Sequence, residues 1–315
     1  MGKIAFLFPG QGSQTVGMGK ELAVSDQKVA DIFSEADKAL QFPLSSVIFE
    51  GPKEKLTLTT NAQPALLTTS IAILQKFTEF NIKPDFVAGH SLGEYTALVA
   101  ANALSFTDGV QIVHKRGEFM EEAVPHGQGT MAAILGMDRE KLTEITEKVT
   151  ETVGSVQLAN LNCPGQIVIS GTKDGVDKAC ELAKENGARR AIPLEVSGPF
   201  HSRLMEPASN RLHKLLTTVN IRNAEIPVIS NVTAKPVQDA EEIKQLLVQQ
   251  LFSPVLWEDS IRYLLENGVD TFIEIGPGKV LTGLVKKIDR TVHTFAIFDE
   301  ESINHTVREL EGGKS

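Results

Sequence analysis

The sequence predicts an α/β protein, in which a doubly wound, mostly parallel sheet is interrupted by a smaller unit of the order β-α-β-β-α-β. Three observations lead to this prediction. Short apolar runs bounded by turn residues are typical of buried strands, and helical patterns alternate with them. After a linker-like stretch at 125–129 the order changes, and the earlier alternation resumes near residue 203.

The first part of the core is expected before residue 125. Lys3–Phe8 is an apolar run that stops at Pro9, as buried strands of parallel sheets do. The other expected elements are helices at about 21–40 and 65–80, a strand at 85–89, and helices at 91–101 and 110–123.

The smaller unit is expected at 126–202. Asp138 is a suitable cap for its first helix, and Gly187 is a suitable stop for its second. The expected elements are a strand at 130–136, a helix at 138–152, strands at 155–161 and 166–170, a helix at 173–186 and a strand at 188–196. This order is the ferredoxin-like arrangement.

The core resumes after this unit. The expected elements are a helix near 203–219, a strand at 227–230, helices at 240–251 and 255–267, a strand at 271–275, a further helix and a strand at 292–298. The sequence therefore predicts a catalytic core domain made of 1–125 and 203–315, with a small ferredoxin-like domain, 126–202, inserted into it.

Composition excludes several classes of function. The 315 residues include 31 basic and 40 acidic side chains, a net charge of −9, so no global basic field for nucleic acid or an anionic membrane is expected. No apolar run of about 18 residues is present, and the first run is too short for a signal peptide. With two cysteines and no Cys/His cluster at zinc spacing, we expect a cytoplasmic protein with no metal site.

Ser91 is the candidate nucleophile. It lies in Gly89-His90-Ser91-Leu92-Gly93, a G-x-S-x-G motif between a predicted strand and a predicted helix. Such a turn exposes the serine at a helix N-terminus, where backbone N–H groups stabilise a developing oxyanion. The N–H of Leu92 is the expected first donor. The alternative interpretation is an ordinary Gly-Ser turn that caps a helix.

His201 is the candidate base among seven histidines. It follows the last strand of the small unit and precedes a helix, where irregular backbone can direct a side chain into a cleft. His90 adjoins the nucleophile but points to the opposite face of its strand, and His114 is expected to be solvated. No aspartate stands out as a third member, so a Ser–His dyad oriented by a neutral acceptor is expected. The alternative is a structural histidine.

Arg116 lies on the apolar face of its helix. The residues three and four positions away are all apolar: Ile112, Val113, Phe119 and Met120. A buried unpaired charge is costly, so Arg116 either forms a structural ion pair, with Glu94 or another acid, or binds an anionic substrate. A planar guanidinium can hold a carboxylate through two parallel hydrogen bonds.

Gln11 lies in the loop that follows the first strand. The loop suggests phosphate binding, but Met18 stands where a Walker lysine is required, and Thr15 where a dinucleotide-binding loop has its third glycine. In a hydrolase-like site the N–H of Gln11 could supply the second oxyanion donor. Otherwise this loop is an ordinary βα turn.

As a set, these motifs resemble the malonyl-CoA:acyl carrier protein transacylases of bacterial type II fatty acid synthesis. The residues that carry the resemblance are FPGQGSQ at 8–14, GHSLGE at 89–94, Arg116, ANLNCPGQ at 159–166, GPFHS at 198–202, and Gln250-Leu251 ahead of SPVLW at 253–257. The resemblance covers about residues 3–300 and implies an α/β-hydrolase-like core with a ferredoxin-like insertion.

The resemblance also implies a reaction. A malonyl group would move from malonyl-CoA to the phosphopantetheine thiol of acyl carrier protein through a malonyl-serine, with no metal or redox cofactor. The implied roles are Ser91 as nucleophile, His201 as base, Arg116 as the clamp for malonate, Gln11 and Leu92 as oxyanion donors, Gln250 as the carbonyl that orients His201, and Phe200 as the bulky neighbour that excludes an α-methyl group. The sequence does not tell whether Gln250 acts through its backbone or its side chain.

Three other functions remain compatible with the sequence. A free-standing acyltransferase that serves a polyketide synthase would differ only in its carrier. A serine hydrolase, such as a thioesterase, would share the nucleophile turn, but Arg116 and the two-domain pattern disfavour it. A non-catalytic binding module would have no need of both Ser91 and His201.

Docking of an acidic carrier would require a local basic patch on this acidic chain. The two candidates are Arg189-Arg190, and Lys286-Lys287 with Arg290. Either group could also be ordinary solvated charge.

Overall fold

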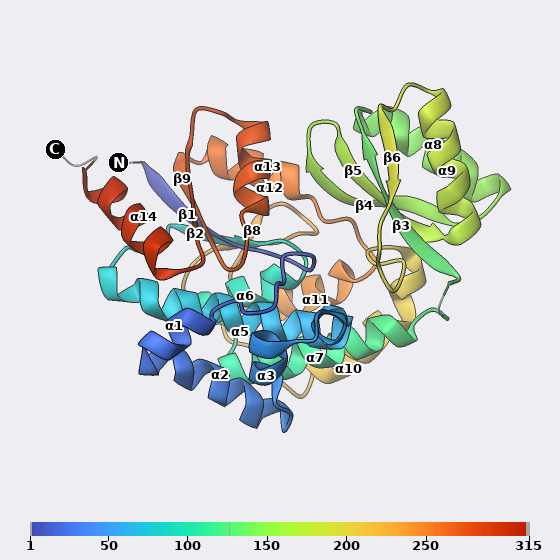
Figure 1. Ribbon diagram of the computed structural model, residues 1–315. Helices are drawn as coiled ribbons and strands as arrows, with labels where there is room; N and C mark the ends of the chain where they lie inside the picture. The colour runs from blue at the N-terminus through green and yellow to red at the C-terminus, as the bar shows by residue number, and fades with distance from the viewer. Residues whose placement is uncertain (1, 126, 313–315) are drawn as a thin grey trace.

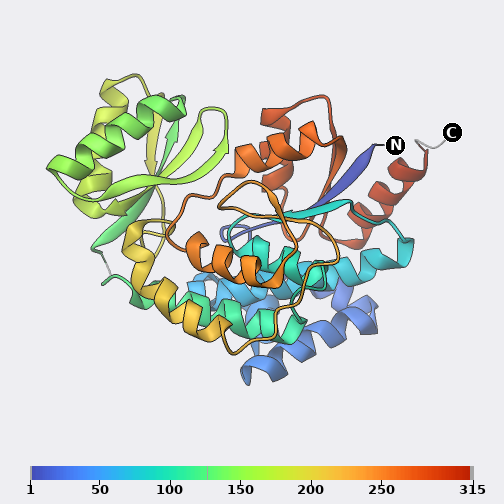
Figure 2. The ribbon, with the colours of Figure 1, turned by 180° about the vertical axis from the view of Figure 1, so that it is seen from behind.

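Two sheets organise the computed structural model, which describes residues 2–125 and 127–312 (Figure 1). Within these residues the larger sheet has six strands in the order β10-β9-β1-β2-β7-β8, and the smaller has four in the order β4-β5-β3-β6. The small sheet and its helices stand beside the larger unit, and Figure 2 shows the two from behind. His126, where the inserted unit was expected to begin, lies outside the described residues.

The larger sheet is parallel except at one edge. Its central strand, β1 (Lys3–Phe8), pairs in parallel with β2 (Phe86–Gly89) and with β9 (Val269–Ile275). Outside these lie the parallel strands β10 (His293–Ile297) and β7 (Val228–Ile229), and the antiparallel edge strand β8 (Pro236–Val237).

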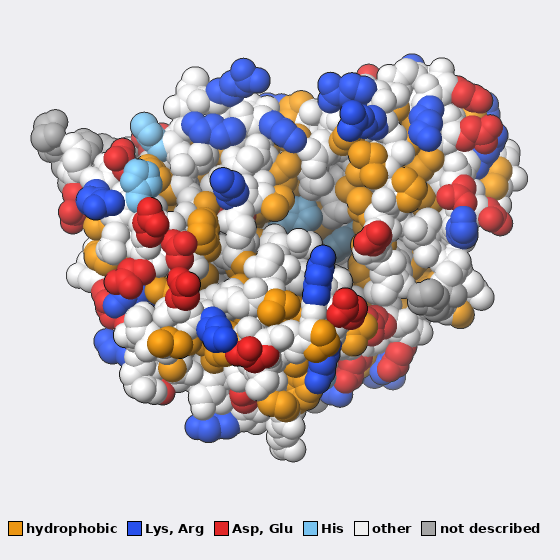
Figure 3. Space-filling view, viewed as in Figure 1, with side chains coloured by type: hydrophobic (Ala, Val, Ile, Leu, Met, Phe, Trp, Pro, Cys, Tyr) orange, Lys and Arg blue, Asp and Glu red, His pale blue; other side chains and the backbone are white. Residues whose placement is uncertain are grey.

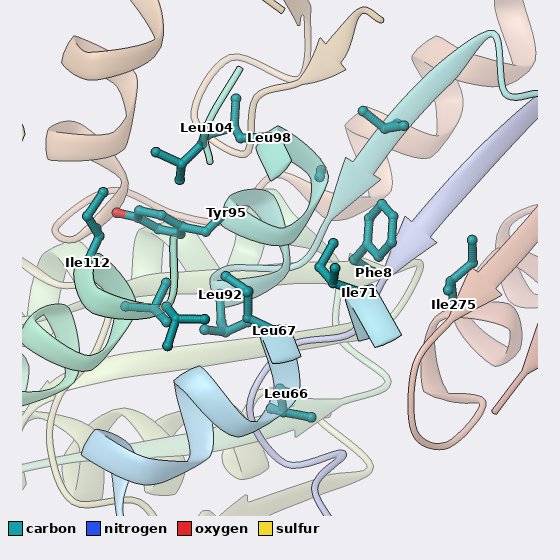
Figure 4. Close-up of a cluster of buried hydrophobic side chains, with 14 of the residues drawn as sticks. Phe8, Leu66, Leu67, Ile71, Leu92, Tyr95, Leu98, Leu104, Ile112 and Ile275 are labelled. Atoms are coloured by element: carbon teal, nitrogen blue, oxygen red, sulfur yellow. The ribbon is translucent and has the colours of Figure 1, made fainter. Parts of the chain in front are cut away.

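Helices cover both faces of this sheet, and the alternating side chains of β1 contribute to a hydrophobic core on each face. Phe6 and Phe8 belong to the main hydrophobic core, whereas Ala5 and Leu7 belong to a second core on the opposite face. The helices of the first face are α5 (Thr59–Phe77), α6 (Leu92–Ala100) and α7 (Phe106–Glu122), and those of the second are α12 (Trp257–Glu266) and α13 (Val280–Ile288). Figure 4 shows the first core, where α5, α6 and β1 meet. The predicted doubly wound sheet is confirmed.

The small sheet is antiparallel and has the predicted ferredoxin-like order. Its strands are β3 (Gly129–Leu135), β4 (Val156–Cys163), β5 (Gln166–Thr172) and β6 (Arg190–Pro193), and its helices are α8 (Arg139–Thr152) and α9 (Lys173–Glu185). The free edge of β4 joins the core, since the N–H of Leu161 donates to the Val255 carbonyl at 2.9 Å and the N–H of Val255 to the Ala159 carbonyl at 2.8 Å.

The remaining helices surround these layers. They are α1 (Lys20–Ser25), α2 (Gln27–Leu40), α3 (Leu44–Glu50), α4 (Lys53–Thr57), α10 (Glu206–Leu216), α11 (Ala240–Gln250) and α14 (Glu300–Gly312). Of these, α3, α4 and α14 were not predicted from the sequence. The expected single helix at 21–40 is two, because the carboxylate of Asp26 accepts from the N–H groups of Lys28 and Val29 and starts α2 afresh. No helix in the described part of the chain is long and apolar enough to cross a membrane.

Helix α5 begins at Thr59 rather than at 65 and contains Pro64 in its interior. Proline has no N–H, so the carbonyl of Thr60, one turn earlier, has no partner within the helix. The ring of His114 on α7 supplies one, with its Nδ1 2.8 Å from that carbonyl oxygen. A Cβ atom at Gly117 would come within 2.9 Å of the Thr59 carbonyl oxygen, so the two helices are in backbone contact there. His114, expected to be solvated, instead ties α7 to α5.

Candidate active site

Ser91 lies in a sharp turn between β2 and α6. Its backbone has φ 53° and ψ −106°, in the left-handed region that L-residues avoid. Glycines make the turn sterically feasible, because a Cβ on Gly89 would lie 1.9 Å from the Gly93 backbone, and one on Gly93 2.1 Å from the Phe8 carbonyl oxygen. The structure thus places Ser91 in the strained strand–turn–helix geometry that its motif predicted.

Asn231 holds this turn together, although sequence reasoning missed it. Its Oδ1 accepts from the N–H of Ser91 at 2.7 Å, and its Nδ2 donates to the Gly89 carbonyl at 2.7 Å. Asn231 is buried just beyond the end of β7, at the same edge of the sheet as the turn. A polar residue that follows a buried apolar strand was the signal available in the sequence.

Ser91 and His201 form the expected dyad. The Ser91 Oγ lies 2.7 Å from His201 Nε2, and His201 Nδ1 lies 2.8 Å from the backbone carbonyl oxygen of Gln250. A carbonyl only accepts, so Nδ1 carries the proton and Nε2 is the acceptor for the serine hydroxyl. Burial and the charge of Arg116 lower the pKa of His201 to about 3, which leaves the imidazole neutral.

The small sheet supports the loop that carries His201. His201 also has a positive φ, 57°, which residues other than glycine rarely adopt. The side chain of Gln157, on β4, donates to the His201 carbonyl at 3.3 Å and accepts from the N–H of Arg203 at 3.1 Å. The orientation of the dyad therefore depends on both sheets.

Arg116 is fully buried beside the dyad, with only neutral partners. It donates to Gln63 Oε1 at 2.7 Å, to the side-chain Oε1 of Gln250 at 3.0 Å and to Ser91 Oγ at 3.2 Å. Its guanidinium also lies 5.4 Å from the ring centroid of Tyr95. The ion pair with Glu94 considered from the sequence is not formed, because the amide of Gln250 stands between the two groups.

The expected oxyanion donors lie at the same site. In the described part of the chain the backbone N–H groups of Gln11 and Leu92 have no acceptor, and both residues line the cavity in front of Ser91. The Gln11 side chain donates to Thr59 Oγ1 at 3.2 Å, which holds its loop over α5.

A cavity of about 550 Å³ opens in front of these groups, between the larger unit and the small sheet. Figure 3 shows the hollow, with histidine atoms recessed in it and Lys and Arg side chains on the surface above it. Phe200, 6% exposed, forms part of the wall next to His201. His90, also in the wall, lies with its Nε2 2.9 Å from Asn162 Oδ1, so it contacts the small sheet rather than Ser91.

Comparison with known proteins gives a consistent result. The acyl transferase domain family model matches residues 5–308. The chain is 63% identical over 311 residues to the malonyl CoA-acyl carrier protein transacylase of Bacillus subtilis strain 168, which covers 99% of this chain and 98% of that protein.

Solved structures agree over the same length. The malonyl CoA-acyl carrier protein transacylase of Clostridium perfringens superposes with a TM-score of 0.96 at 42% identity, covering 99% of this chain and 98% of that one. A malonyl-transacylase solved in complex with its type II polyketide synthase acyl-carrier protein superposes with a TM-score of 0.95 at 41% identity, covering 98% and 99%.

Proposed function

Because the chain belongs to the malonyl CoA-acyl carrier protein transacylase family, we propose that Ser91, His201 and Arg116 carry out the reaction of that family. The enzyme transfers the malonyl group of malonyl-CoA to acyl carrier protein for fatty acid synthesis. One observation supports the assignment of residues above all: the Ser91 hydroxyl lies within hydrogen-bond distance of both His201 and Arg116. The base and the clamp thus meet at the nucleophile.

In the first half-reaction, His201 Nε2 takes the proton of Ser91 as Oγ attacks the thioester carbon of malonyl-CoA. The N–H groups of Gln11 and Leu92 hold the tetrahedral oxyanion, and the Gln250 carbonyl stabilises the imidazolium. The carbon–sulfur bond then breaks, and CoA leaves as its thiol with the proton from His201. The product of this step is malonyl-Ser91.

In the second half-reaction, His201 takes the proton of the phosphopantetheine thiol of acyl carrier protein. The sulfur attacks the malonyl ester, and Ser91 leaves with the proton returned by His201. The same base and oxyanion donors serve both steps, so the kinetics are of the ping-pong type.

Arg116 links substrate choice to the strength of the base. Its charge adds to the effect of burial in lowering the pKa of His201 to about 3. A malonyl carboxylate bound to Arg116 would neutralise that charge and raise the pKa of His201, while burial, the larger cause of the low value, keeps the imidazole neutral. The base is therefore strengthened when an acyl group with a carboxylate occupies the site.

The assignment is tested by mixing the enzyme with malonyl-CoA alone and measuring its intact mass. We expect one malonyl adduct, located on Ser91 by peptide mapping and discharged by acyl carrier protein bearing the phosphopantetheine arm. Absence of the adduct, or its location on another residue, contradicts the assignment. Rapid release of free malonate without any thiol acceptor would identify a hydrolase instead.

Two further properties complete the proposal. We propose that 126–202 is an inserted domain and that 1–125 with 203–315 is the catalytic domain, since the small sheet and its two helices enclose a hydrophobic core of their own. We also propose a cytoplasmic location, because Cys163 and Cys180 are both free thiols.

A further inference from the structure

Glu94 is a buried carboxyl at the site that the proposed chemistry does not use. It lies on the first turn of α6 and is 2% exposed. One of its oxygens, Oε2, accepts from Gln250 Nε2 at 2.7 Å and from the N–H of Asn231 at 3.1 Å. Both donors are neutral, so nothing that touches Glu94 directly explains a buried acid here.

The side chain of Gln250 connects Glu94 to Arg116. Its Oε1 accepts from the guanidinium at 3.0 Å, and its Nε2 donates to the carboxylate at 2.7 Å. A guanidinium only donates and a carboxylate only accepts, so the two charges determine which end of the amide faces which. The same residue orients His201 through its backbone carbonyl.

This arrangement balances the charge of Arg116 without a direct ion pair. A buried cation needs an anion nearby, but a carboxylate in contact with the guanidinium would take the hydrogen bonds that a substrate needs. With one amide in between, the Nη2 group of Arg116 still reaches Ser91 Oγ at 3.2 Å. The Nη2 group that donates to Gln250 therefore also faces the position of an acyl group on Ser91.

We propose that Glu94 is a positioning residue and the counter-charge of Arg116, which holds the guanidinium in place through Gln250 and gives up its negative charge by taking a proton when a malonyl carboxylate binds. The proposal rests on the proposed function, because it assumes that Arg116 receives that carboxylate.

The electrostatics of the site support this role. Burial raises the pKa of Glu94 to about 7, and Arg116 opposes that rise. A second anion on Arg116 would raise the pKa of Glu94 further, so proton uptake accompanies malonyl binding.

None of the other titratable groups around Glu94 changes charge near neutral pH. The pKa of Tyr95 is raised to about 12, that of His201 is lowered to about 3, and that of His90 is also lowered by burial. Arg116 stays protonated, and the other packed side chains, Asn231 and Gln250, do not titrate.

The test compares Glu94→Gln with Glu94→Met in the first half-reaction alone, using malonyl-CoA and acetyl-CoA. Glutamine keeps an acceptor for both N–H groups but carries no charge, whereas methionine has similar length and no oxygen. Glu118→Gln makes the same chemical change at a partly exposed position of α7 and serves as the control.

In the wild type we expect the apparent affinity for malonyl-CoA to fall as pH rises above 7, because Glu94 must then bind a proton, while acetyl-CoA shows no such dependence. Glu94→Gln should lose this pH dependence and at pH 8.5 should raise the malonyl-over-acetyl ratio of kcat/KM about tenfold. Glu94→Met should lower that ratio, because Gln250 is no longer held against Arg116.

Two results would overturn the proposal. One is an unchanged pH profile and selectivity in Glu94→Gln; the other is an equal loss with both acyl groups in Glu94→Gln, which indicates a merely structural residue. If Glu94→Met fails to fold, Glu94→Gln still decides. Failure of the proposed function is distinguishable, because the wild-type enzyme would then form no malonyl-Ser91 at all.

Discussion

The turn that carries Ser91 and the pocket that holds Arg116 are built in different ways. The turn is set by backbone sterics, with glycines at 89 and 93 where no Cβ fits. The pocket is a network of buried side chains from separate helices, which brings Gln63 and Gln250 to the guanidinium. In the proposed function, the first region carries out the acyl transfer, whereas the second selects which acyl group is transferred. Chemistry and selectivity should therefore be separable by mutation.

The largest effect is expected from Ser91→Ala. It should remove the acyl adduct with malonyl-CoA and acetyl-CoA alike and lower transfer by roughly 10⁴–10⁶-fold, because no other group can form the ester. Intact mass and steady-state transfer measure this loss, and circular dichroism checks the fold. A residual adduct on another residue would contradict the role of Ser91.

A selective effect is expected from Arg116→Ala. Loss of a buried, hydrogen-bonded charge contact costs about 2–5 kcal/mol, and this cost should fall on malonyl-CoA and not on acetyl-CoA. The ratio of kcat/KM for the two substrates measures it. Lys115→Ala, at the neighbouring half-exposed position, is the control and should change neither value. Unchanged selectivity in Arg116→Ala would place the carboxylate clamp elsewhere.

A smaller change in selectivity is expected from Phe200→Ser. The ring fills the wall next to His201, so its removal should admit an α-methyl group and improve methylmalonyl-CoA relative to malonyl-CoA by about 1–3 kcal/mol. Competition between the two substrates measures this. Phe200→Leu, which keeps most of the volume, should show little gain, and an equal gain in both variants would contradict the steric explanation.

The smallest effect is expected at the docking surface, outside both regions. In the described part of the chain the side chains of Arg189 and Arg190 have no hydrogen-bond or ion-pair partner. By contrast, Lys286 donates a hydrogen bond to the Val292 carbonyl, and Lys287 donates one to the side chain of Gln166. We therefore predict that Arg189→Glu with Arg190→Glu slows transfer to the carrier severalfold, in a salt-dependent way, and leaves malonylation of Ser91 unchanged.

The two half-reactions are measured separately in this double variant. Reversal of Lys286 and Lys287 is the comparison, and it should act on stability instead of on carrier docking. Equal losses in both half-reactions of the arginine variant would indicate a damaged site rather than weaker docking.

The sequence predicted the sheets, the turn that carries Ser91 and the pairing of Ser91 with His201, because each leaves a local signal. Apolar runs indicated β1, β2 and β9, and the glycines around Ser91 indicated the turn. The same approach missed the two-residue strand β8 and the short helices α3 and α4, which have too few residues for a periodic pattern. It also placed the start of α5 after Pro64, because an interior proline normally ends a helix.

The network around Arg116 could not be predicted in the same way. Gln63 and Asn231 lie among other buried polar side chains, such as Asn61 and Ser230, so the sequence does not distinguish them, and their roles depend on where distant elements meet. Glu94 was considered as a direct partner of Arg116, but the intervening amide of Gln250 appears only in the three-dimensional arrangement.

Because His114 contacts the carbonyl that Pro64 leaves without a helical partner, substitutions at these two positions depend on each other in evolution. An ordinary residue at 64 would donate to the Thr60 carbonyl within the helix and leave His114 without that role. The two positions should therefore show non-additive free energies in a double-mutant cycle, with the loss of His114 costing about 1 kcal/mol beside proline and less beside alanine. They are coupled positions, at which the order of two substitutions decides whether the intermediate is tolerated.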